Sequence, residues 1–556
     1  MNKYTNPTTR FRFVVAVLSL LISHPCLSLA AEPIRVFIFA GQSNMVGSDS
    51  KVDDIDRFPP FRGLESAQPN VRFSYSIGRE RKTESNGWVD LQPVNNIVGP
   101  ELSFARTITN AIDAPIAIIK VAAGGTHLGG DWNPDEPSGF EMYPLALKLV
   151  QQSLRELEDA GHEYRLEGFI WHQGENDMFN EEYMANYGKN LKNFLMRWRT
   201  DLQTPKLRFY LGELCTKTIW GMDLRPRMYA ISLGQKEVAA NDDMAQYVPT
   251  SHVGVEIGGG VGLHYHYGTL GQLEHGVNYA TAYLRNQGLE SEQRSAQEVF
   301  KKLPYTKRKP VKLFIMAGHR NMEGERAFTQ ELSELDEQKY LLHPQGKVAY
   351  QYSLGGGYKT SRGWEVLRPA GYYDTFGPEL SFAAEITKRS NDQIAIAKFT
   401  HSGSQIIDWT PEGSIAKTRH LYPTFIKFIR HSKQSLLDLG FEVEIAGVFY
   451  HLGENDMSFF PYRKDAASRL RTIVSQSRID LEMPELDWFV SQQPPTNDER
   501  VNKIDVVTLV NEVANLDSRL HHIKVFDLPP QEKKLVITTE GILQLGETIA
   551  RFYLNQ

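Results

Sequence analysis

Residues 36–47 read VFIFAGQSNMVG, and residues 313–324 read LFIMAGHRNMEG. Further blocks follow both stretches in the same order: GPELSFA at Gly99 and Gly377, Asp-Trp ending at Trp132 and Trp409, Tyr-Pro at Tyr143 and Tyr422, and GENDM at Gly174 and Gly453. The paired blocks are separated by 277 to 279 residues. A nearly constant separation over so many blocks indicates a duplicated domain.

The repeat sets the expected domain boundaries. The first copy occupies residues 32–285, and the second occupies residues 310–556. The polar, charged stretch 286–309 between them is predicted to be a linker. Once about 30 N-terminal residues are removed, about 526 remain, which suits two large domains.

The first 30 residues have the pattern of a secretory signal peptide. Basic Lys3, Arg10 and Arg12 precede an apolar run at 13–22, and small residues follow up to Ala30. This order predicts cleavage near Ala30 and a secreted or periplasmic protein. No later stretch approaches the roughly 20 apolar residues of a membrane span, so no membrane attachment is expected after cleavage.

Composition narrows the class of protein further. Hydrophobic residues make up 41% of the chain and charged residues 23%, which is typical of a globular protein. The formal net charge of −6 is spread over 556 residues and argues against a nucleic-acid partner. Only Cys215 lies beyond the signal peptide, so no intramolecular disulfide is possible.

Short apolar runs alternate with stretches of helical periodicity in the first copy. The predicted strands are 35–40, 117–122, 168–171 and 207–211, and the predicted helices are 102–112, 143–160 (stopped by Gly161) and 181–198. This alternation predicts an α/β fold in which helices cover both faces of a parallel sheet. GQSNM, GGT and HQGEND each follow a predicted strand, so they should meet at the carboxyl edge of the sheet.

Ser43 is the candidate nucleophile. It follows a buried strand, has small neighbours and precedes no obvious helix, which suits an exposed reactive hydroxyl. A serine in a tight turn can equally be a turn or cap residue. The surroundings are not the G-x-S-x-G elbow of α/β-hydrolases, so a different catalytic arrangement is expected.

FAGQSNM, GPELSFA, the GGT segment at Gly124 and WHQGEND together resemble the sequence blocks of the SGNH hydrolase superfamily. The similarity is to its branch of sialate O-acetylesterases and acetylxylan esterases, and it extends over both copies. The resemblance implies two tandem flavodoxin-like domains, each a parallel sheet sandwiched by helices. It also implies a serine esterase that removes O-acetyl groups from carbohydrates without a metal or another cofactor.

The resemblance assigns roles at the site. Ser43 would attack the acetyl carbonyl. The oxyanion hole would be formed by the backbone N–H of Ser43, by Gly99 or the Gly124 segment, and by the side-chain amide of Gln173. Preorganised donors of this kind stabilise a tetrahedral intermediate, each by roughly 3 to 4 kcal/mol.

The general base should be a histidine near the end of the copy. In the family, a His-aromatic pair stands five residues before the glycine that opens the last helix. Taking Gly271 as that glycine selects His266, and His264 is the competitor because a tyrosine follows it too. If both lay on one strand they would share a face, and a metal pair is a third reading.

The triad acid departs from the family pattern. Many relatives carry an Asp three residues before the His, whereas Leu263 or Val261 stands there in this chain. Part of the family uses the Glu of the HQGE block instead, which is Glu175 here. Asp177 is the next candidate. Without an acid the imidazolium would lose the group that orients it.

The second copy keeps GENDM but loses the reactive groups. Arg320 replaces the nucleophile, Leu452 the oxyanion Gln and Val536 the base. An Arg side chain cannot act as a serine-like nucleophile, so this domain is predicted to be inactive. Because GENDM survives there, the loop also has a structural role. The alternative for the whole chain is a catalytically decayed glycan-binding or structural protein.

Several side chains in the predicted loops could contact a sugar: His127, Asp131, Trp132, Trp171 and Trp220. Aromatic faces beside polar donors suit sugar rings. Tryptophans are also commonly buried in the core, and the sequence alone does not separate the two roles.

Overall fold

A computed structural model describes residues 32–79, 82–214, 218–219, 222–250, 266–289, 299–414, 419–458, 463–494, 505–529 and 536–556. The predicted signal peptide lies outside the described residues, as do Cys215, Trp220 and His264. The described residues form one large sheet in each copy and one small two-stranded sheet.

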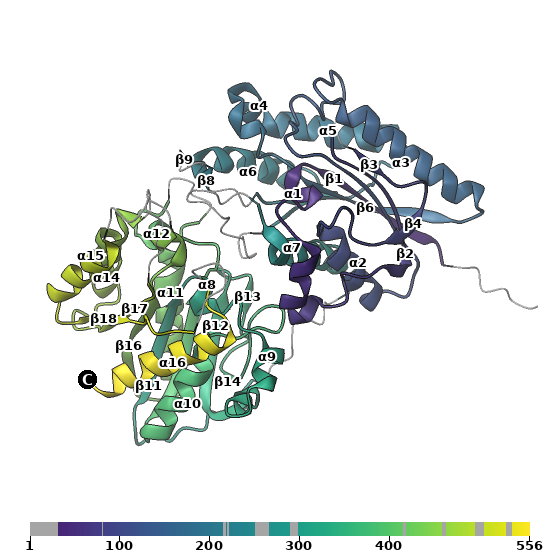
Figure 1. Ribbon diagram of the computed structural model, residues 1–556. Helices are drawn as coiled ribbons and strands as arrows, with labels where there is room; N and C mark the ends of the chain where they lie inside the picture. The colour runs from purple at the N-terminus through teal and green to yellow at the C-terminus, as the bar shows by residue number, and fades with distance from the viewer. Residues whose placement is uncertain are drawn as a thin grey trace, which may run out of the picture. The chain divides into compact units, whose positions relative to one another are not determined.

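The first sheet has eight strands in the order β10-β7-β6-β1-β5-β2-β3, with β4 beside β2 (Figure 1). Its parallel strands are β1 (Ile34–Gly41), β2 (Gln68–Ile77), β5 (Ile116–Ala122), β6 (Tyr164–His172), β7 (Phe209–Gly212) and β10 (Ala245–Val248). Short β3 (Thr83–Glu84) and β4 (Val89–Leu91) run antiparallel to β2. The strand that leads into the GQSNM block, β1, therefore lies in the middle of the sheet.

Helices cover both faces of this sheet (Figure 1). They are α1 (Ser43–Val46), α2 (Pro100–Ala111), α3 (Met142–Asp159), α4 (Glu181–Ala185), α5 (Tyr187–Asp201), α6 (Arg225–Ala240) and α7 (Gly268–Asn286). Alternate β1 residues belong to different cores. Val36 and Ile38 pack with α3, α5 and α6, whereas Phe37 and Phe39 pack with α2 and α7. The strand is apolar on both sides because both sides are buried.

The second sheet repeats the order, as β12-β15-β11-β16-β17-β18 with β13 and β14 at the β12 edge. Its strands are β11 (Val311–Gly318), β12 (Gln345–Leu354), β13 (Lys359–Thr360), β14 (Glu365–Leu367), β15 (Gln393–Thr400), β16 (Val443–His451), β17 (Trp488–Gln492) and β18 (Leu520–Lys524). The same strand order in both copies confirms the duplication.

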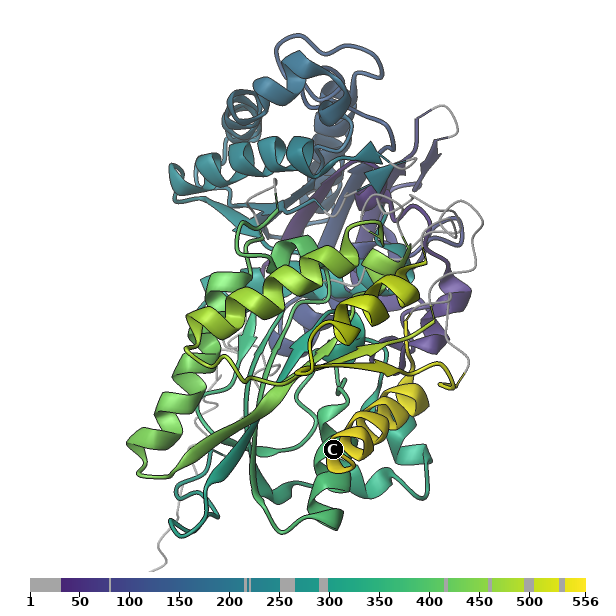
Figure 2. The ribbon, with the colours of Figure 1, turned by 90° about the vertical axis from the view of Figure 1, so that its left-hand side faces the viewer.

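The helices of the second copy are α8 (Arg320–Glu323), α9 (Thr329–Glu334), α10 (Glu379–Arg389), α11 (Tyr422–Asp438), α12 (Glu454–Ser458), α14 (Ala466–Asp480), α15 (Val506–Asn515) and α16 (Thr539–Leu554). One core takes in residues of α11, α14 and α15, and the other takes in residues of α10 and α16. Figure 2 shows the yellow α16 and the yellow-green α14 on opposite sides of the strands. The predicted α/β fold, with helices on both faces of each sheet, is confirmed in both copies.

Smaller elements complete the fold. The 3₁₀ helices are η1 (Val52–Arg57), η2 (Pro59–Phe61), η3 (Asp177–Phe179), η4 (Lys339–Leu342) and η5 (Ile406–Trp409), and β8 (Thr218–Ile219) pairs with β9 (Met222–Asp223). The end of the predicted linker belongs to the second domain. Leu303 and Tyr305 are buried in its core, and Tyr305 Oη accepts a hydrogen bond from the Ala349 N–H at 2.8 Å. These apolar side chains explain why a stretch that is polar on average still packs.

Three details differ from the sequence prediction. A one-turn helix, α1, begins at Ser43, where no helix was expected, and Gly47 closes it with φ +100°. The helix predicted at 181–198 is divided into α4 and α5 at Asn186. The last helix begins at Gly268 with φ +67°, not at Gly271, because only glycine enters this left-handed conformation readily. The count that selected His266 was therefore wrong, although His266 still precedes this helix.

Candidate active site

The loops after β1, β5 and β6 meet at one edge of the first sheet. Gly41, the last residue of β1, is in register with Ala122 of β5 and His172 of β6. The Ala123 N–H donates to the Gly41 carbonyl, and the Gln42 N–H donates to that of His172, both at 3.1 Å. The predicted convergence of GQSNM, GGT and HQGEND is confirmed.

Ser43 occupies the turn from β1 into α1. The turn is tight, because a Cβ atom on Gly41 would lie 2.1 Å from the carbonyl oxygen of His172. Gly124 lies against the serine, since a Cβ atom placed there would be 3.5 Å from Cβ of Ser43. As the first residue of a helix, Ser43 has a backbone N–H without an intrahelical acceptor. The hydroxyl therefore lies beside two backbone segments that could bind an anion.

Asn44, which sequence reasoning missed, joins the catalytic loops. Its side chain is fully buried. Nδ2 donates to Glu175 Oε1 at 2.6 Å, and Oδ1 accepts from the Tyr267 N–H at 3.3 Å. The residue after the nucleophile is thus bonded to the residue after His266, and this contact brings the two chain segments together. The sequence signal for this structural role is that the second copy retains an asparagine, Asn321, at the same position.

Glu175 is buried in the interior of this edge. Besides Asn44, its Oε1 lies 3.5 Å from Nε2 of His172. Burial alone would raise the pKa of this carboxyl, but the interactions with His172 and Asn44 hold the pKa below its usual value. In the described part of the chain Glu175 pairs with these two residues, not with His266. Its role as the triad acid stays a prediction.

Gln173 and Asp177, in the loop after β6, bond to each other and to the loop after β5. The Gln173 amide donates to the Thr126 carbonyl at 2.9 Å and to an Asp177 carboxylate oxygen. Asp177 also accepts from the backbone N–H groups of Leu128 and Gly129, at 2.9 and 3.0 Å. Burial raises the pKa of Asp177. Because the amide already donates to Thr126 and to Asp177, the role of Gln173 as an oxyanion donor stays a prediction.

The GPELSFA block has a structural role in both copies. Glu101 and Lys120 form a buried ion pair at 2.7 Å, and Glu379 and Lys398 form the same pair at 2.7 Å. Gly99 is packed against the first pair, since a Cβ atom there would lie 2.2 Å from Glu101 Oε2. Gly124, by contrast, contacts Ser43 directly.

His266 lies two residues before α7, and its ring is largely buried. Its Nδ1 is 2.6 Å from Oδ2 of Asp49, a residue of the loop that follows α1. Asp49 was not considered from the sequence, because 217 residues separate the two. The competitor His264 lies outside the described residues.

Behind the site is a buried cluster of aromatic and histidine rings. His172 Nδ1 is 3.1 Å from the Tyr279 hydroxyl, and its ring meets that of His275 edge-on at 4.5 Å. Tyr267 packs on His275 at 4.7 Å and donates its hydroxyl to the Thr250 Oγ1 at 2.8 Å. This packing holds the end of β6 and the start of α7 together beneath the catalytic loops.

The structure separates core from rim among the predicted sugar contacts. Trp132 and Trp171 are fully buried and pack edge to face at 5.2 Å, so they are core residues. His127 is partly exposed and pairs with the buried Asp131 at 3.1 Å. The bond to Asp131 raises the pKa of His127. Arg79 is exposed, and Gly125 lies next to its guanidinium.

The equivalent edge of the second copy keeps the framework without the reactive groups. Asn321 Oδ1 accepts from the Ile537 N–H at 2.9 Å, as Asn44 does from Tyr267, which places Val536 where His266 stands. Arg320 is buried in the position of Ser43, and its N–H donates to Glu454 at 3.0 Å. Burial raises the pKa of Glu454 to about 8.

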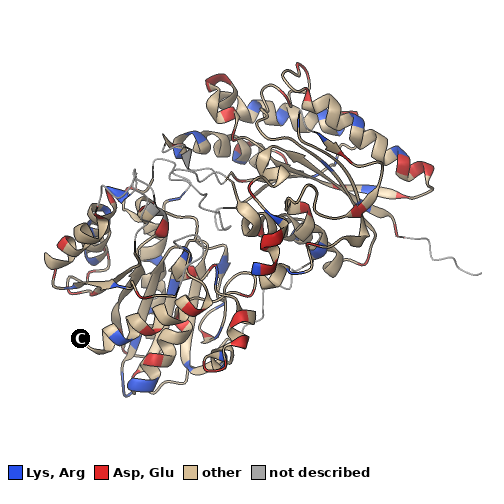
Figure 3. Ribbon diagram, in the orientation of Figure 1, with Lys and Arg blue, Asp and Glu red and all other residues tan. Residues whose placement is uncertain are grey.

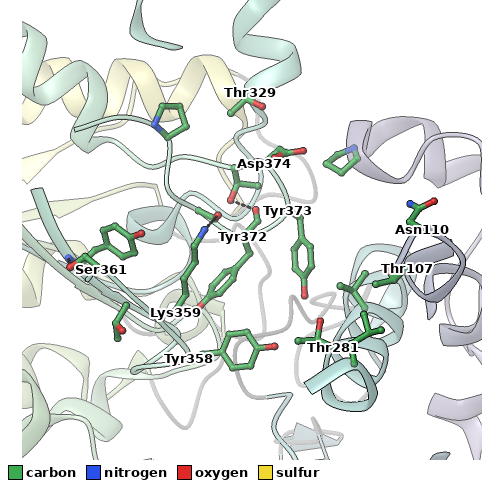
Figure 4. Close-up of a pocket in the computed structure, with 18 of the residues that line it drawn as sticks. Thr107, Asn110, Thr281, Thr329, Tyr358, Lys359, Ser361, Tyr372, Tyr373 and Asp374 are labelled. Carbon is green, nitrogen blue, oxygen red and sulfur yellow. Dashed lines mark hydrogen bonds between the residues drawn. The ribbon is translucent and has the colours of Figure 1, made fainter. Parts of the chain in front are cut away.

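A cavity of about 1260 Å³ lies elsewhere, lined by α2 and α7 and by the region around β13 (Figure 4). Tyr358, Tyr372 and Tyr373 line it, and the first and third of these donate their hydroxyls to Asn278 Oδ1 at 3.0 and 3.1 Å. None of its lining residues is a predicted catalytic or oxyanion residue. The cavity is therefore separate from the Ser43 edge.

The distribution of charged and apolar residues does not identify a further ligand or partner. Acidic and basic residues are interspersed along the ribbon (Figure 3). Across the described ranges, no helix has the length and apolarity that a membrane crossing requires. Within the same ranges, His, Cys, Asp and Glu side chains form no group of three or more placed as metal ligands.

A three-layer α/β domain, with a serine at the end of its central strand and a histidine segment bonded to the serine turn, defines the SGNH class of hydrolase folds. The model of the family described as "Carbohydrate esterase, sialic acid-specific acetylesterase" matches residues 33–285 and again 310–555. The chain belongs to this family, and the two matches correspond to the two copies. Membership supports an esterase with a carbohydrate substrate.

The similarity to individual proteins is weaker than the match to the family model. A probable carbohydrate esterase of Arabidopsis thaliana is 27% identical over 198 residues, which cover 33% of this chain and 70% of the relative. A solved Arabidopsis thaliana structure aligns at 19% identity over 46% of this chain and 99% of its own, with a TM-score of 0.35. A carbohydrate acetylesterase of Xanthomonas citri aligns at 16% identity over 49% and 60%, with a TM-score of 0.33.

Proposed function

We propose that this chain is an exported serine esterase that removes O-acetyl groups from carbohydrates, and that its first domain carries the activity. The observation that carries the proposal is the placement of Ser43. It stands at the end of the central strand, Gly124 lies against it, and the bond between Asn44 and Tyr267 brings the His266 segment beside it.

The reaction follows from these groups. His266 takes the proton of the Ser43 hydroxyl as the oxygen attacks the acetyl carbonyl. The negative oxygen of the tetrahedral intermediate is bound by the N–H groups of Ser43 and Gly124. Its collapse expels the sugar hydroxyl, which takes the proton back from His266. Water activated by His266 then releases acetate from the acetyl-serine.

Gln173 would be a third donor only after giving up one of its loop contacts. Such a change would loosen the anchoring that Asp177 gives to the GGT segment. We therefore assign the oxyanion hole mainly to the two backbone N–H groups. Gly124 is preferred to Gly99, because Gly99 is packed against the buried Glu101–Lys120 pair.

The second domain is inferred to be inactive. Arg320 fills the nucleophile position, and Leu452 and Val536 supply neither an amide nor an imidazole. Its retained fold suits a scaffold or a glycan-binding surface. Export rests on the N-terminal sequence pattern, and N-terminal sequencing of the protein recovered from periplasm and medium would test it.

The activity is tested by acetate release. The substrates are p-nitrophenyl acetate, acetylated xylan and O-acetylated sialic acid. Ser43→Ala should lower kcat by at least about 10³-fold, whereas Ser66→Ala, at an exposed serine of the same domain, should leave it unchanged. If the wild-type protein melts cooperatively, binds the glycans and releases no acetate, the glycan-binding alternative replaces the esterase.

A further inference from the structure

We propose that Asp49 is the carboxylate that positions His266, in place of the aspartate missing before the histidine. This inference rests on the proposed esterase function. Its starting observation is the distance of 2.6 Å between Asp49 Oδ2 and His266 Nδ1. The pairing assigns to the loop after the nucleophile a role that sequence reasoning gave to the HQGE block.

The nitrogen that meets Asp49 is the one the chemistry requires. An ionised carboxylate only accepts hydrogen bonds, so Nδ1 must carry the proton in this pair. The neutral ring then has its lone pair on Nε2, where a base can take the proton of a serine hydroxyl. The acid in a serine triad fixes this tautomer and stabilises the imidazolium that forms during attack.

The loop that carries Asp49 is anchored on both sides. The next residue, Ser50, is buried and donates its hydroxyl to the Gly47 carbonyl at 2.6 Å. Ser50 Oγ also accepts from the Val98 N–H at 2.8 Å. One residue further, the Lys51 N–H donates to Thr269 Oγ1 in the first turn of α7 at 2.9 Å. The carboxylate is therefore presented from a fixed backbone, next to the start of the helix that His266 precedes.

Comparison of the two copies supports the pairing independently. The 277-residue offset of the GQSNM block places Arg326 at the position of Asp49. The shared bond to Asn44 or Asn321 places Val536 at the position of His266. Both members of the pair are thus replaced in the second copy, in which Arg320 stands at the position of the nucleophile.

Glu175 behaves in the opposite way. Its counterpart Glu454 is kept where nucleophile and base are both missing, and it accepts from the Arg320 N–H. A carboxylate that persists without a base has a task other than orienting one. Glu175 accordingly holds the serine turn through Asn44, and Asp49 is the carboxylate that contacts the histidine.

The test compares Asp49→Asn, Asp49→Glu and Glu175→Gln, with Asp53→Asn as a matched control on an exposed aspartate of the same segment. Asp49→Asn should lower kcat on the order of 10²- to 10⁴-fold with KM within about twofold, because the role proposed for Asp49 is to orient His266 and not to bind substrate. Asp49→Glu should restore part of kcat, and Asp53→Asn should change nothing.

The second readout is the Nδ1–H resonance of His266, assigned by nitrogen-15 labelling of histidine and by a His266→Gln variant. We expect this hydrogen-bonded proton in the wild-type protein and in Glu175→Gln, and its loss in Asp49→Asn. The proposal is overturned if Asp49→Asn keeps both kcat and the resonance. An inactive wild type that shows the resonance would refute the esterase function while leaving the pairing intact.

Discussion

Replacing Asn44 by Ala should destabilise the first domain more than the equivalent Asn321→Ala destabilises the second. Both side chains are buried, and both accept one backbone N–H, at 3.3 Å in the first copy and 2.9 Å in the second. The groups that accept from their side-chain amides differ. Asn44 donates to the carboxylate of Glu175 and Asn321 to the neutral amide of Gln493, each at 2.6 Å.

The expected magnitudes follow from this difference. A hydrogen bond to a charged group contributes about 1.5 to 3 kcal/mol and a neutral one about 1 kcal/mol. Loss of both bonds should therefore cost about 2.5 to 4 kcal/mol at Asn44 and about 2 kcal/mol at Asn321. Because the two sites are matched, the difference of about 0.5 to 2 kcal/mol is a measure of the charge on Glu175.

Acidification should remove the difference in destabilisation between Asn44→Ala and Asn321→Ala. The pKa of Glu175 is held below its ordinary value of 4.5, so its contribution to stability is present above pH 4.5 and is lost as the pH falls through the lower folded-state value. The cost of Asn44→Ala should thus shrink on acidification, while that of Asn321→Ala stays constant above the range where the protein unfolds.

Hydrogen–deuterium exchange separates the two domains, because amides of β1 and β11 report their own unfolding free energies. The measurement is made on the full chain at pH 7 and again at the lowest pH at which the chain stays folded. Equal costs at the two asparagines, or a cost at Asn44 that does not change with pH, would refute the assignment of Glu175 as an ionised partner of the serine turn.

Two further outcomes are expected. Arg320→Ser in a Ser43→Ala background should give no acetate release, and recovered activity would contradict the assignment of an inactive copy. The same change should lower the unfolding free energy of the second domain by about 3 to 5 kcal/mol, because the buried Glu325 carboxylate loses the guanidinium that lies 3.4 Å away. His127→Gln should destabilise the protein more at pH 5.5 than at pH 8.5. The raised pKa of His127, which comes from Asp131, adds stability below pH 6.5 that is lost as the pH rises through the folded-state value. Urea unfolding at both pH values measures this difference, and an equal loss at each would count against the ion pair.

The parts of the fold that could be predicted are those with a buried, regular pattern. β1 and β5 are apolar on both faces, so their runs stand out in the sequence. β2 was missed because exposed and buried positions mix along it. α1 was missed because a helix of four residues has no measurable period. Gly268 could not be told from Gly271 as the helix start, because the sequence does not show which of the two glycines has a positive φ.

In the candidate site, too, some residues could be predicted from the sequence and others could not. Ser43 could be found because its motif is local, whereas the partners of Asn44 and Asp49 lie 131 and 217 residues away. Such pairs leave no periodic signal in a single chain. The duplication partly replaces the missing information, because each copy folds under the same packing constraints with different chemistry.

Features kept in both copies therefore describe what the fold needs. The buried Lys–Glu pair, the asparagine after the nucleophile position and the loop aspartate that accepts backbone N–H groups all belong to this set. Ser43, His266 and Asp49 are all absent from the second copy, whose described strands keep the order of the first. A residue whose loss leaves the fold intact, and which is lost together with the nucleophile, is better explained by chemistry than by stability. By this criterion Asp49, and not Glu175, completes the set of groups that acts with Ser43.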